Sequence, residues 1–276
     1  MSDLVATTPL DLDAYFARIG YSGARAPTLA VLAEIQRRHV YSIPFENLDI
    51  HLGRPIRIDL PSITQKLIAG KRGGYCFEQN TLLRAALRAL GFKVTSLIGR
   101  VRWLVPVDEE TALTHMLLMV EIEGERWLAD VGFGSGSLTA PLRIDTEEPQ
   151  PTPHEPRRII QREGVYIQQS NMPGEWTDVY HFTLRPAPDV DFQVGNWYTS
   201  TFPQSRFRLN LSIARADEGL RYSLLNREFT SRYKDGRVEK RQVSSPEELL
   251  GILSRYFHLE FPVGTRFEAP NAKWDC

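Results

Sequence analysis

Cysteine is scarce in this sequence: the 276 residues include only Cys76 and Cys276. So few cysteines exclude a disulfide framework, and this usage is typical of proteins from a reducing compartment. Cys276 is the last residue, and we expect it to lie in an exposed tail. Cys76 is therefore the candidate for a reactive thiol, and its surroundings in the sequence are the ones to examine.

The sequence also lacks an excess of positive or negative charge, and it lacks long apolar runs. The formal net charge is -1 at pH 7, which argues against nucleic acid or an anionic membrane as the main partner, because both attract a surplus of Lys and Arg. No apolar run approaches the roughly 18 residues of a membrane span, and residues 1–9 lack the basic and apolar parts of a signal peptide. We expect a soluble, cytoplasmic protein with a small-molecule ligand.

The motifs of zinc and nucleotide sites are absent as well, since the sequence has no H-E-x-x-H, C-x-x-C or Walker A pattern. The segment Gly-Phe-Gly-Ser-Gly-Ser at 132–137 resembles a phosphate loop only superficially, because it ends a predicted hairpin and no helix follows it. We therefore expect no metal and no nucleotide-binding fold. Such a glycine turn can still bring backbone N–H groups close to a ligand's phosphates.

Core-forming residues, by contrast, are plentiful. Apolar residues make up 42% and charged residues 24%, as in a globular chain of one large or two to three modest domains. The first ninety residues predict helices that are capped at Thr28 and Ser62 and that end at Gly20, before Pro44 and at Gly70. Their apolar residues recur at helical spacing: Leu12, Tyr15, Phe16 and Ile19; Leu29, Leu32 and Ile35; Ile63, Leu67 and Ile68.

The stretch Arg-Gly-Gly-Tyr-Cys-Phe-Glu-Gln-Asn at 72–80 precedes a further helical pattern at 77–90. Cys76 then lies at a helix N-terminus, where unpaired N–H groups and the helix dipole favour a thiolate. The glycines permit a backbone path that other residues cannot follow. A buried packing cysteine is the alternative, and a base and a carboxylate elsewhere in the chain would decide for a nucleophile.

The segment Ile-Pro-Phe-Glu-Asn-Leu at 43–48 connects two predicted helices, because Pro44 cannot continue the first one. In one interpretation Phe45 belongs to the core and Glu46 is a surface charge. In the other, Glu46 pairs with Arg72 and holds the glycine turn by a charge-assisted hydrogen bond.

After Phe92 the apolar period becomes that of strands, predicted at 93–103, 114–122 and 126–131 with a hairpin turn at 123–125. Antiparallel pairing brings His115 and Asp130 to the same end of this hairpin, as the base and orienting carboxylate that a cysteine nucleophile needs. Singly, each has an ordinary alternative, a strand histidine and a turn aspartate before Gly132. No acidic residue is so clearly delivered beside the other histidines, which are His39, His51, His154, His181 and His258.

The rest of the chain predicts mostly short strands, with a barrel or curled sheet in the middle. The predicted elements are a surface loop at 145–156, strands at 157–163, 165–170 and 176–184, a helical turn at 189–196, a connection at 200–207, and strands broken at 216–219 and 234–236. Ser245, Pro246 and Glu248 form a capping-box pattern for a last helix.

Three ordered motifs, Arg-Gly-Gly-Tyr-Cys-Phe-Glu at 72–78, Thr-His at 114–115 and Asp-Val-Gly-Phe-Gly at 130–134, resemble the arylamine N-acetyltransferases. The resemblance extends to 44–47 and 200–207, whereas 146–182 carries little of the pattern. It implies an α+β fold with a cysteine-protease-like catalytic core. Three domains are expected: a helical bundle at 1–91 with the nucleophile, a β-barrel at 92–207 with His and Asp, and an α/β lid at 208–276.

The resemblance also implies acetyl-CoA as acyl-donor cosubstrate, no metal, and an arylamine, hydrazine or N-hydroxyarylamine as acceptor, with ping-pong kinetics. It leaves the oligomeric state open. Together with the residue patterns it assigns these roles: catalysis to Cys76, His115 and Asp130, the acceptor pocket to Phe45, Phe133 and Phe207, close approach of the donor to Gly134, and support of the site to Arg72 and Glu46.

The same three catalytic residues fit other activities. Papain-like and transglutaminase-like enzymes also use Cys, His and Asp or Asn in this chain order, and a wet pocket would favour hydrolysis. An amide synthase that closes a macrocycle is a second alternative within the fold. A non-catalytic module that binds coenzyme A is a third, and it predicts ordinary thiol reactivity for Cys76.

Overall fold

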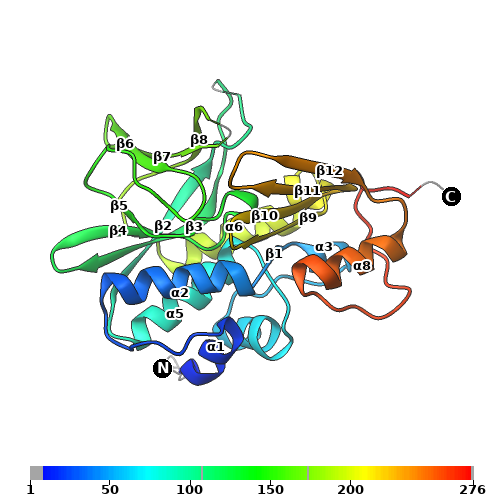
Figure 1. Cartoon of the computed structure of the whole chain (residues 1–276), viewed down its shortest axis with the longest axis horizontal. Helices are drawn as coiled ribbons and strands as arrows, with labels where there is room; N and C mark the ends of the chain where they lie inside the picture. The colour runs from blue at the N-terminus through cyan, green and yellow to red at the C-terminus, as the bar shows by residue number, and fades with distance from the viewer. Residues whose placement is uncertain (1–8, 107, 173, 275–276) are drawn as a thin grey trace.

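The computed structural model describes residues 9–106, 108–172 and 174–274 as an α+β fold, which confirms the predicted class. The N-terminal helices lie together on one side of two antiparallel sheets of seven and five strands, and the last helix lies beside the five-stranded sheet (Figure 1). Cys276 and most of the N-terminal segment considered above lie outside the described residues. Among the described residues, no helix is long and apolar enough to cross a membrane.

The N-terminal helices begin and end largely where the sequence predicts. Thr28 caps its helix, and Gly20 ends the first one in the left-handed conformation that glycine tolerates. The cap predicted at Ser62 is wrong, because the Asp59 carboxylate accepts the hydrogen bond from the Ser62 N–H. The helices of this region are α1 (Leu12–Ile19), α2 (Leu29–Ser42), α3 (Leu48–His51), α4 (Leu60–Ile63), the π-helical turn η1 (Thr64–Ala69) and α5 (Cys76–Ala89).

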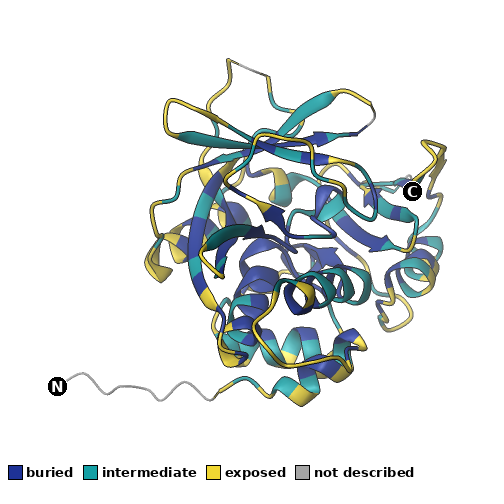
Figure 2. Ribbon diagram, turned by 60° about the vertical axis from the view of Figure 1, so that its left-hand side comes forward, coloured by how far each residue is buried: buried dark blue, intermediate teal, exposed yellow. Residues whose placement is uncertain are grey.

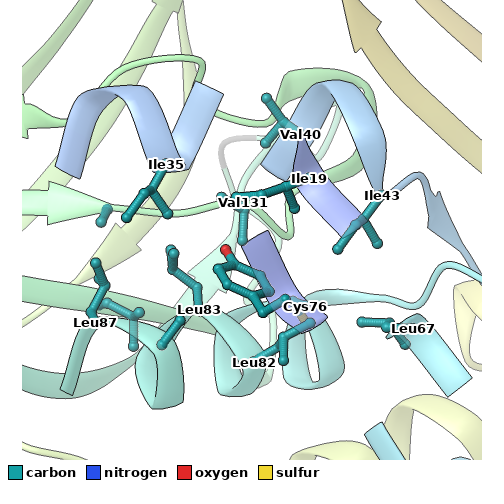
Figure 3. Close-up of a cluster of buried hydrophobic side chains, with 14 of the residues drawn as sticks. Ile19, Ile35, Val40, Ile43, Leu67, Cys76, Leu82, Leu83, Leu87 and Val131 are labelled. Atoms are coloured by element: carbon teal, nitrogen blue, oxygen red, sulfur yellow. The ribbon is translucent and has the colours of Figure 1, made fainter. Parts of the chain in front are cut away.

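The helical core forms where the apolar faces of α1, α2 and α5 meet. In Figure 3, Ile35 of α2 lies opposite Leu83 and Leu87 of α5, and Ile19 of α1 and Cys76 at the start of α5 belong to the same cluster. Figure 2 colours the described residues by burial and shows buried residues where helices and sheets face one another. Burial of one such leucine contributes roughly 1.5–3 kcal/mol, so this cluster fixes the position of α5.

The seven-stranded sheet has the order β5-β4-β3-β2-β8-β7-β6. A bridge between Gln150 and Arg157 joins the β6 edge to the segment that follows β5, so the sheet curls into a nearly closed barrel. Its predicted hairpin turn lies at Glu123 and Gly124, which both have the positive φ of a tight two-residue turn. The strands are β2 (Lys93–Val101), β3 (Leu113–Ile122), β4 (Glu125–Ala129), β5 (Leu142–Arg143), β6 (Arg157–Arg162), β7 (Val165–Asn171) and β8 (Trp176–Phe182).

The five-stranded sheet includes a strand that sequence analysis missed. Phe45 and Glu46 form β1 (Phe45–Glu46), which pairs with Ala214 and Ile213 of β9 rather than merely connecting two helices. Phe45 also bridges to Gly74, so the glycine turn lies against this strand. The remaining strands are β9 (Ser212–Asp217), β10 (Leu220–Leu225), β11 (Glu228–Tyr233) and β12 (Val238–Gln242).

The segment 189–207 is more helical than predicted. Helix α6 (Asp189–Thr201) continues past the expected helical turn, and α7 (Arg206–Leu209) lies at the end of the expected connection. Gly195 does not end the helix: a Cβ there would lie 2.7 Å from the Phe77 ring, so this glycine allows close packing of α6 on α5. A 3-10 turn, η2 (Gly134–Gly136), follows β4.

The last helix, α8 (Pro246–Phe257), begins at the predicted cap. Ser245 accepts the hydrogen bond of the Glu248 N–H, but the Glu248 carboxylate accepts from Ser244 instead of returning to the cap residue. The division of the chain at residues 91 and 207 stays a prediction.

Candidate active site

Cys76 is the first residue of α5, and its side chain is buried. Its Sγ lies 3.5 Å from the carbonyl oxygen of Thr114, the residue before His115 on β3. The Tyr75 N–H donates to the Glu78 carboxylate at 3.0 Å and so anchors the first turn of the helix. The nucleophile candidate is therefore held at a helix N-terminus that faces the start of β3.

Glycine permits the close backbone approaches around Cys76. A Cβ on Gly73 would overlap the carbonyl oxygen of Pro44, and one on Gly132 would lie 2.6 Å from the Cα of Cys76. The first contact lets the turn before α5 lie against β1. The second lets the segment after β4, which follows Asp130, reach the helix start.

His115 and Asp130 lie together at the same end of the β3–β4 hairpin. The distance between His115 Nε2 and Asp130 Oδ2 is 2.8 Å, and both side chains are buried. Asp130 Oδ1 accepts from Asn80 at 2.9 Å and from the Gly132 N–H at 2.8 Å. Because Asn80 is one helical turn after Cys76, it fastens the carboxylate to the helix that carries the thiol.

Sequence analysis gave Asn80 no role. The signal was available, because Asn80 follows Cys76 by four residues and lies on the same helical face. Its amide also donates to the Met116 carbonyl, and its oxygen accepts from the Val131 N–H at 3.1 Å. One side chain thus ties α5 to both β3 and the end of β4.

The electrostatic surroundings favour an imidazolium and a carboxylate. Burial lowers the pKa of His115, but the charge and hydrogen bond of Asp130, with a hydrogen bond to the Cys76 thiol, raise it to about 10. Burial raises the pKa of Asp130, and His115, Asn80 and Gly132 together hold it below its ordinary value. His115 is therefore protonated at neutral pH, with its Nε2 directed at Asp130.

A buried cluster of charges supports the turn before α5. Arg72 lies 2.7 Å from Glu46 and 3.2 Å from Asp49, while the Lys66 Nζ lies 2.8 Å from Asp49 and from Glu78. The ion pair between Arg72 and Glu46 is the one that the sequence suggested. Sequence analysis missed Lys66, Asp49 and Glu78, because they come together only through tertiary packing. Burial and the neighbouring Glu46 raise the pKa of Glu78 to about 7, against the effect of Lys66.

The three phenylalanines proposed for an acceptor pocket lie around the glycine turns. The rings of Phe45 and Phe207 are 5.7 Å apart, and the Phe133 ring is 5.1 Å from the His115 ring. Gly134 has a positive φ, and a Cβ there would lie 3.4 Å from the Phe45 ring. Phe45 is buried, whereas Phe133 and Phe207 are half-buried. A surface pocket of about 410 Å³ near Arg84 and Arg88 includes none of these residues.

A second histidine also has an acidic neighbour, which corrects the expectation from the sequence. His181 Nε2 lies 3.0 Å from Asp178 on β8, but both side chains are partly exposed, unlike those of His115 and Asp130. Within the described part of the chain, no group of three or more His, Cys, Asp or Glu side chains could hold a metal ion.

Comparisons with known proteins agree with these motifs. A family model described as N-acetyltransferase matches residues 28–265. An arylamine N-acetyltransferase of Escherichia coli (strain K12) is 41% identical over 257 residues, which cover 91% of this chain and 89% of that protein. The chain belongs to the arylamine N-acetyltransferase family. This confirms the resemblance inferred from the three motifs.

Other members of the family extend the comparison. A Salmonella typhimurium relative named arylamine N-acetyltransferase / N-hydroxyarylamine O-acetyltransferase is 39% identical and covers 90% of this chain and 88% of its own length. The structure of the M. tuberculosis arylamine N-acetyltransferase superimposes with a TM-score of 0.87 at 38% identity, covering 90% of this chain and 93% of that one. The Mycobacterium marinum enzyme in complex with CoA gives a TM-score of 0.87 at 37% identity, covering 90% and 92%.

Replacing Arg72 by alanine is expected to lower the free energy of unfolding by roughly 3 kcal/mol, because Glu46 would lose its closest partner in a buried site. The matched control is Arg25→Ala, which removes the exposed ion pair between Arg25 and Asp13 and should cost less than about 1 kcal/mol. Urea unfolding of both variants measures the difference. Equal losses in the two variants would remove the support role from Arg72.

The pH dependence of stability should report the His115–Asp130 pair. Since the folded pKa of His115 is raised to about 10, the stabilisation is complete below the unfolded value of about 6.5 and is lost as pH rises towards 10. The difference in unfolding free energy between the wild type and His115→Gln should therefore shrink from pH 6 to pH 10, by on the order of a few kcal/mol. Urea titrations at several pH values test this, and a constant difference would contradict it.

Proposed function

We propose that this protein transfers an acetyl group from acetyl-CoA to the nitrogen of an arylamine, arylhydrazine or N-hydroxyarylamine, through an acetyl-Cys76 intermediate. The observation that carries the proposal is the placement of the Cys76 thiol at a helix N-terminus, with its Sγ 3.5 Å from the carbonyl oxygen of Thr114, next to His115, whose Nε2 lies 2.8 Å from Asp130. Family membership and the CoA complex of the M. marinum enzyme support the choice of donor. The names of the relatives support an arylamine as acceptor, and the name of the Salmonella typhimurium relative adds N-hydroxyarylamines, with the hydroxyl oxygen as the atom acetylated in that protein.

In the first half-reaction the Cys76 thiolate attacks the thioester carbonyl. The carbon–sulfur bond to Cys76 forms, the bond to the coenzyme breaks, and the departing thiolate takes the proton of the His115 imidazolium. The free N–H groups of the first turn of α5, including that of Cys76, are suited to stabilise the tetrahedral oxyanion. Asp130 holds the ring in one orientation and stabilises its positive charge.

In the second half-reaction the amine nitrogen attacks the acetyl-cysteine, His115 accepts its proton, and Cys76 leaves as the thiolate. Aromatic amines suit this step because they are largely unprotonated at neutral pH, whereas alkylamines are mostly ammonium ions. The acetyl group rests on the enzyme between the two steps, so the kinetics are ping-pong.

For the acceptor we assign an aromatic site to Phe45, Phe133 and Phe207. The ring of Phe133 lies edge-on to His115, which places an apolar surface next to the group that must accept the amine proton. Gly134 lies in the turn that follows, where a backbone without a side chain permits close approach of the donor. Arg72 and Glu46 support the site by holding the turn before Cys76.

Incubation with acetyl-CoA alone should add one acetyl group to Cys76, and the group should persist until an arylamine is supplied. Intact-mass and peptide mass spectrometry measure this directly. Rapid release of acetate without amine would show a hydrolase instead. Absence of acetylation, with ordinary iodoacetamide reactivity of Cys76, would leave only a binding module.

Asp130→Asn should retain the fold and slow acetylation of Cys76 by several orders of magnitude, because the imidazole loses its orienting anion. Asp178→Asn is the matched control, since it changes the carboxylate beside His181 and should leave the rate unchanged. Single-turnover acetylation rates distinguish the two. Near-wild-type acetylation of the Asp130 variant would contradict the assignment.

A further inference from the structure

Four neighbouring residues on the inner side of the barrel have buried polar atoms without a hydrogen-bond partner among the described residues. They lie on three adjacent strands, β6, β7 and β8 (Figure 1). Arg157 pairs across the strands with Ser170, and Gln168 pairs with Tyr180. The unpartnered atoms are Nη1 of Arg157, Oγ of Ser170, Oε1 of Gln168 and the hydroxyl of Tyr180.

On the outer side of the same strands, in contrast, the polar side chain of Gln169 has hydrogen-bond partners. Gln169, between Gln168 and Ser170, receives a hydrogen bond from Arg158 at 2.7 Å and donates one to Asp178 at 2.7 Å. The inner residues, in contrast, have at most 1% of their surface exposed. Buried polar groups are almost always paired in folded proteins, so the inner group indicates a bound species.

The inner group lies beside the proposed catalytic pair. The Tyr180 ring is 4.8 Å from the His115 ring. Burial raises the pKa of Tyr180, as do the nearby charge of Asp130 and the hydrogen-bonding effect of that carboxylate on the hydroxyl, while the charge of Arg157 acts against them. The Tyr180 hydroxyl is thus within electrostatic range of both the carboxylate and the guanidinium.

The remaining contacts of Arg157 leave Nη1 directed away from its ion pair. Its Nε donates to Glu155 at 2.8 Å, and its Nη2 donates to Glu155 and, at 2.9 Å, to the Gly136 carbonyl. Glu155 also pairs with Arg221 at 2.9 Å, so this carboxylate is shared by two buried guanidinium groups. Nη1 is thus a charged donor without a partner among the described residues.

The hydrogen-bonding character of the four unpartnered atoms determines which kind of molecule or ion can bind them. Gln168 Nε2 donates to the Gln169 carbonyl at 2.9 Å, which fixes the amide orientation and leaves an acceptor, Oε1, free. Arg157 Nη1 can only donate, and the two hydroxyls can do both. An anion would suit Arg157 but would be repelled by Gln168 Oε1 and by Asp130. Water is both donor and acceptor, and it fits all four atoms.

We propose that Arg157, Gln168, Ser170 and Tyr180 bind ordered water inside the barrel, and that this water connects the Arg157 guanidinium through the Tyr180 hydroxyl to the Asp130 carboxylate. Arg157 and Gln168 are then positioning residues for the catalytic pair. This second part rests on the proposed function. The water orients the Tyr180 hydroxyl so that its proton faces the carboxylate, which keeps Asp130 ionised and His115 protonated.

The test compares Gln168→Met with Gln169→Met. The first removes the inner acceptor with little change in side-chain volume, and the second makes the same change one residue away on the outer side. A crystal structure of the wild type should show water bonded to at least two of the four atoms. Gln168→Met should lose that water, and alkylation of Cys76 by iodoacetamide at neutral pH should slow about five-fold, the loss expected for one hydrogen bond. Gln169→Met should change neither.

Three results would overturn the proposal. The first is a wild-type site without water density, and the second is a bromide ion at the site in crystals soaked in bromide, which would identify an anion site. The third is identical pH profiles of Cys76 alkylation in the two variants, which would make the water purely structural. If Gln168→Met does not fold, Ser170→Ala replaces it. Because alkylation needs no acetyl-CoA, a failure of acetyl transfer is distinguishable from a failure of this proposal.

Discussion

The buried contact between the His115 imidazolium and the Asp130 carboxylate is the interaction on which the rest of the site depends. Removal of two charges from water is costly, and the cost is offset only when the remaining hydrogen-bonding positions are filled. Asn80 and the Gly132 N–H fill those of Asp130, and the proposed hydrogen bond to Cys76 uses the second ring nitrogen of His115. The hairpin, the helix that carries the thiol and the glycine segment after β4 must therefore all be correctly placed for this pair to exist.

Two buried charge networks flank that contact. On one side, Lys66 and Arg72 form ion pairs with Glu46, Asp49 and Glu78, and they hold the turn that leads into α5. On the other, Arg157 and Arg221 share Glu155 and donate to the carbonyls of Gly136 and Ser137. Both networks bind backbone next to the site rather than the reacting atoms. Buried ion pairs thus hold loop segments in place where the backbone lacks the regular hydrogen bonds of helices and sheets.

Local patterns made much of the fold and the site predictable. Thr28 and Ser245 cap helices because their hydroxyls meet free N–H groups nearby in sequence, and the register of a tight hairpin brings His115 and Asp130 together. Predictions failed where distant residues decide the outcome. Phe45 becomes a strand residue only because β9 lies beside it, and α6 continues to Thr201, past the turn predicted at 189–196, where it packs on α5 through the contact of Gly195 with Phe77. Asn80 had a local signal, but Lys66 and Glu78 had none beyond their charge.

Through strand β1, the surroundings of the Cys76 thiol depend on β9, which comes much later in the chain. Phe45 and Glu46 pair with residues 213 and 214 of β9. Phe45 and Glu46 also contact Gly74, which lies two positions before Cys76. During synthesis, these strand contacts cannot form until residues 213 and 214 have been made. The surroundings of Cys76 are thus completed only after the helices α1 to α5 and the seven-stranded sheet have been synthesised, because all of these precede β9 in the chain.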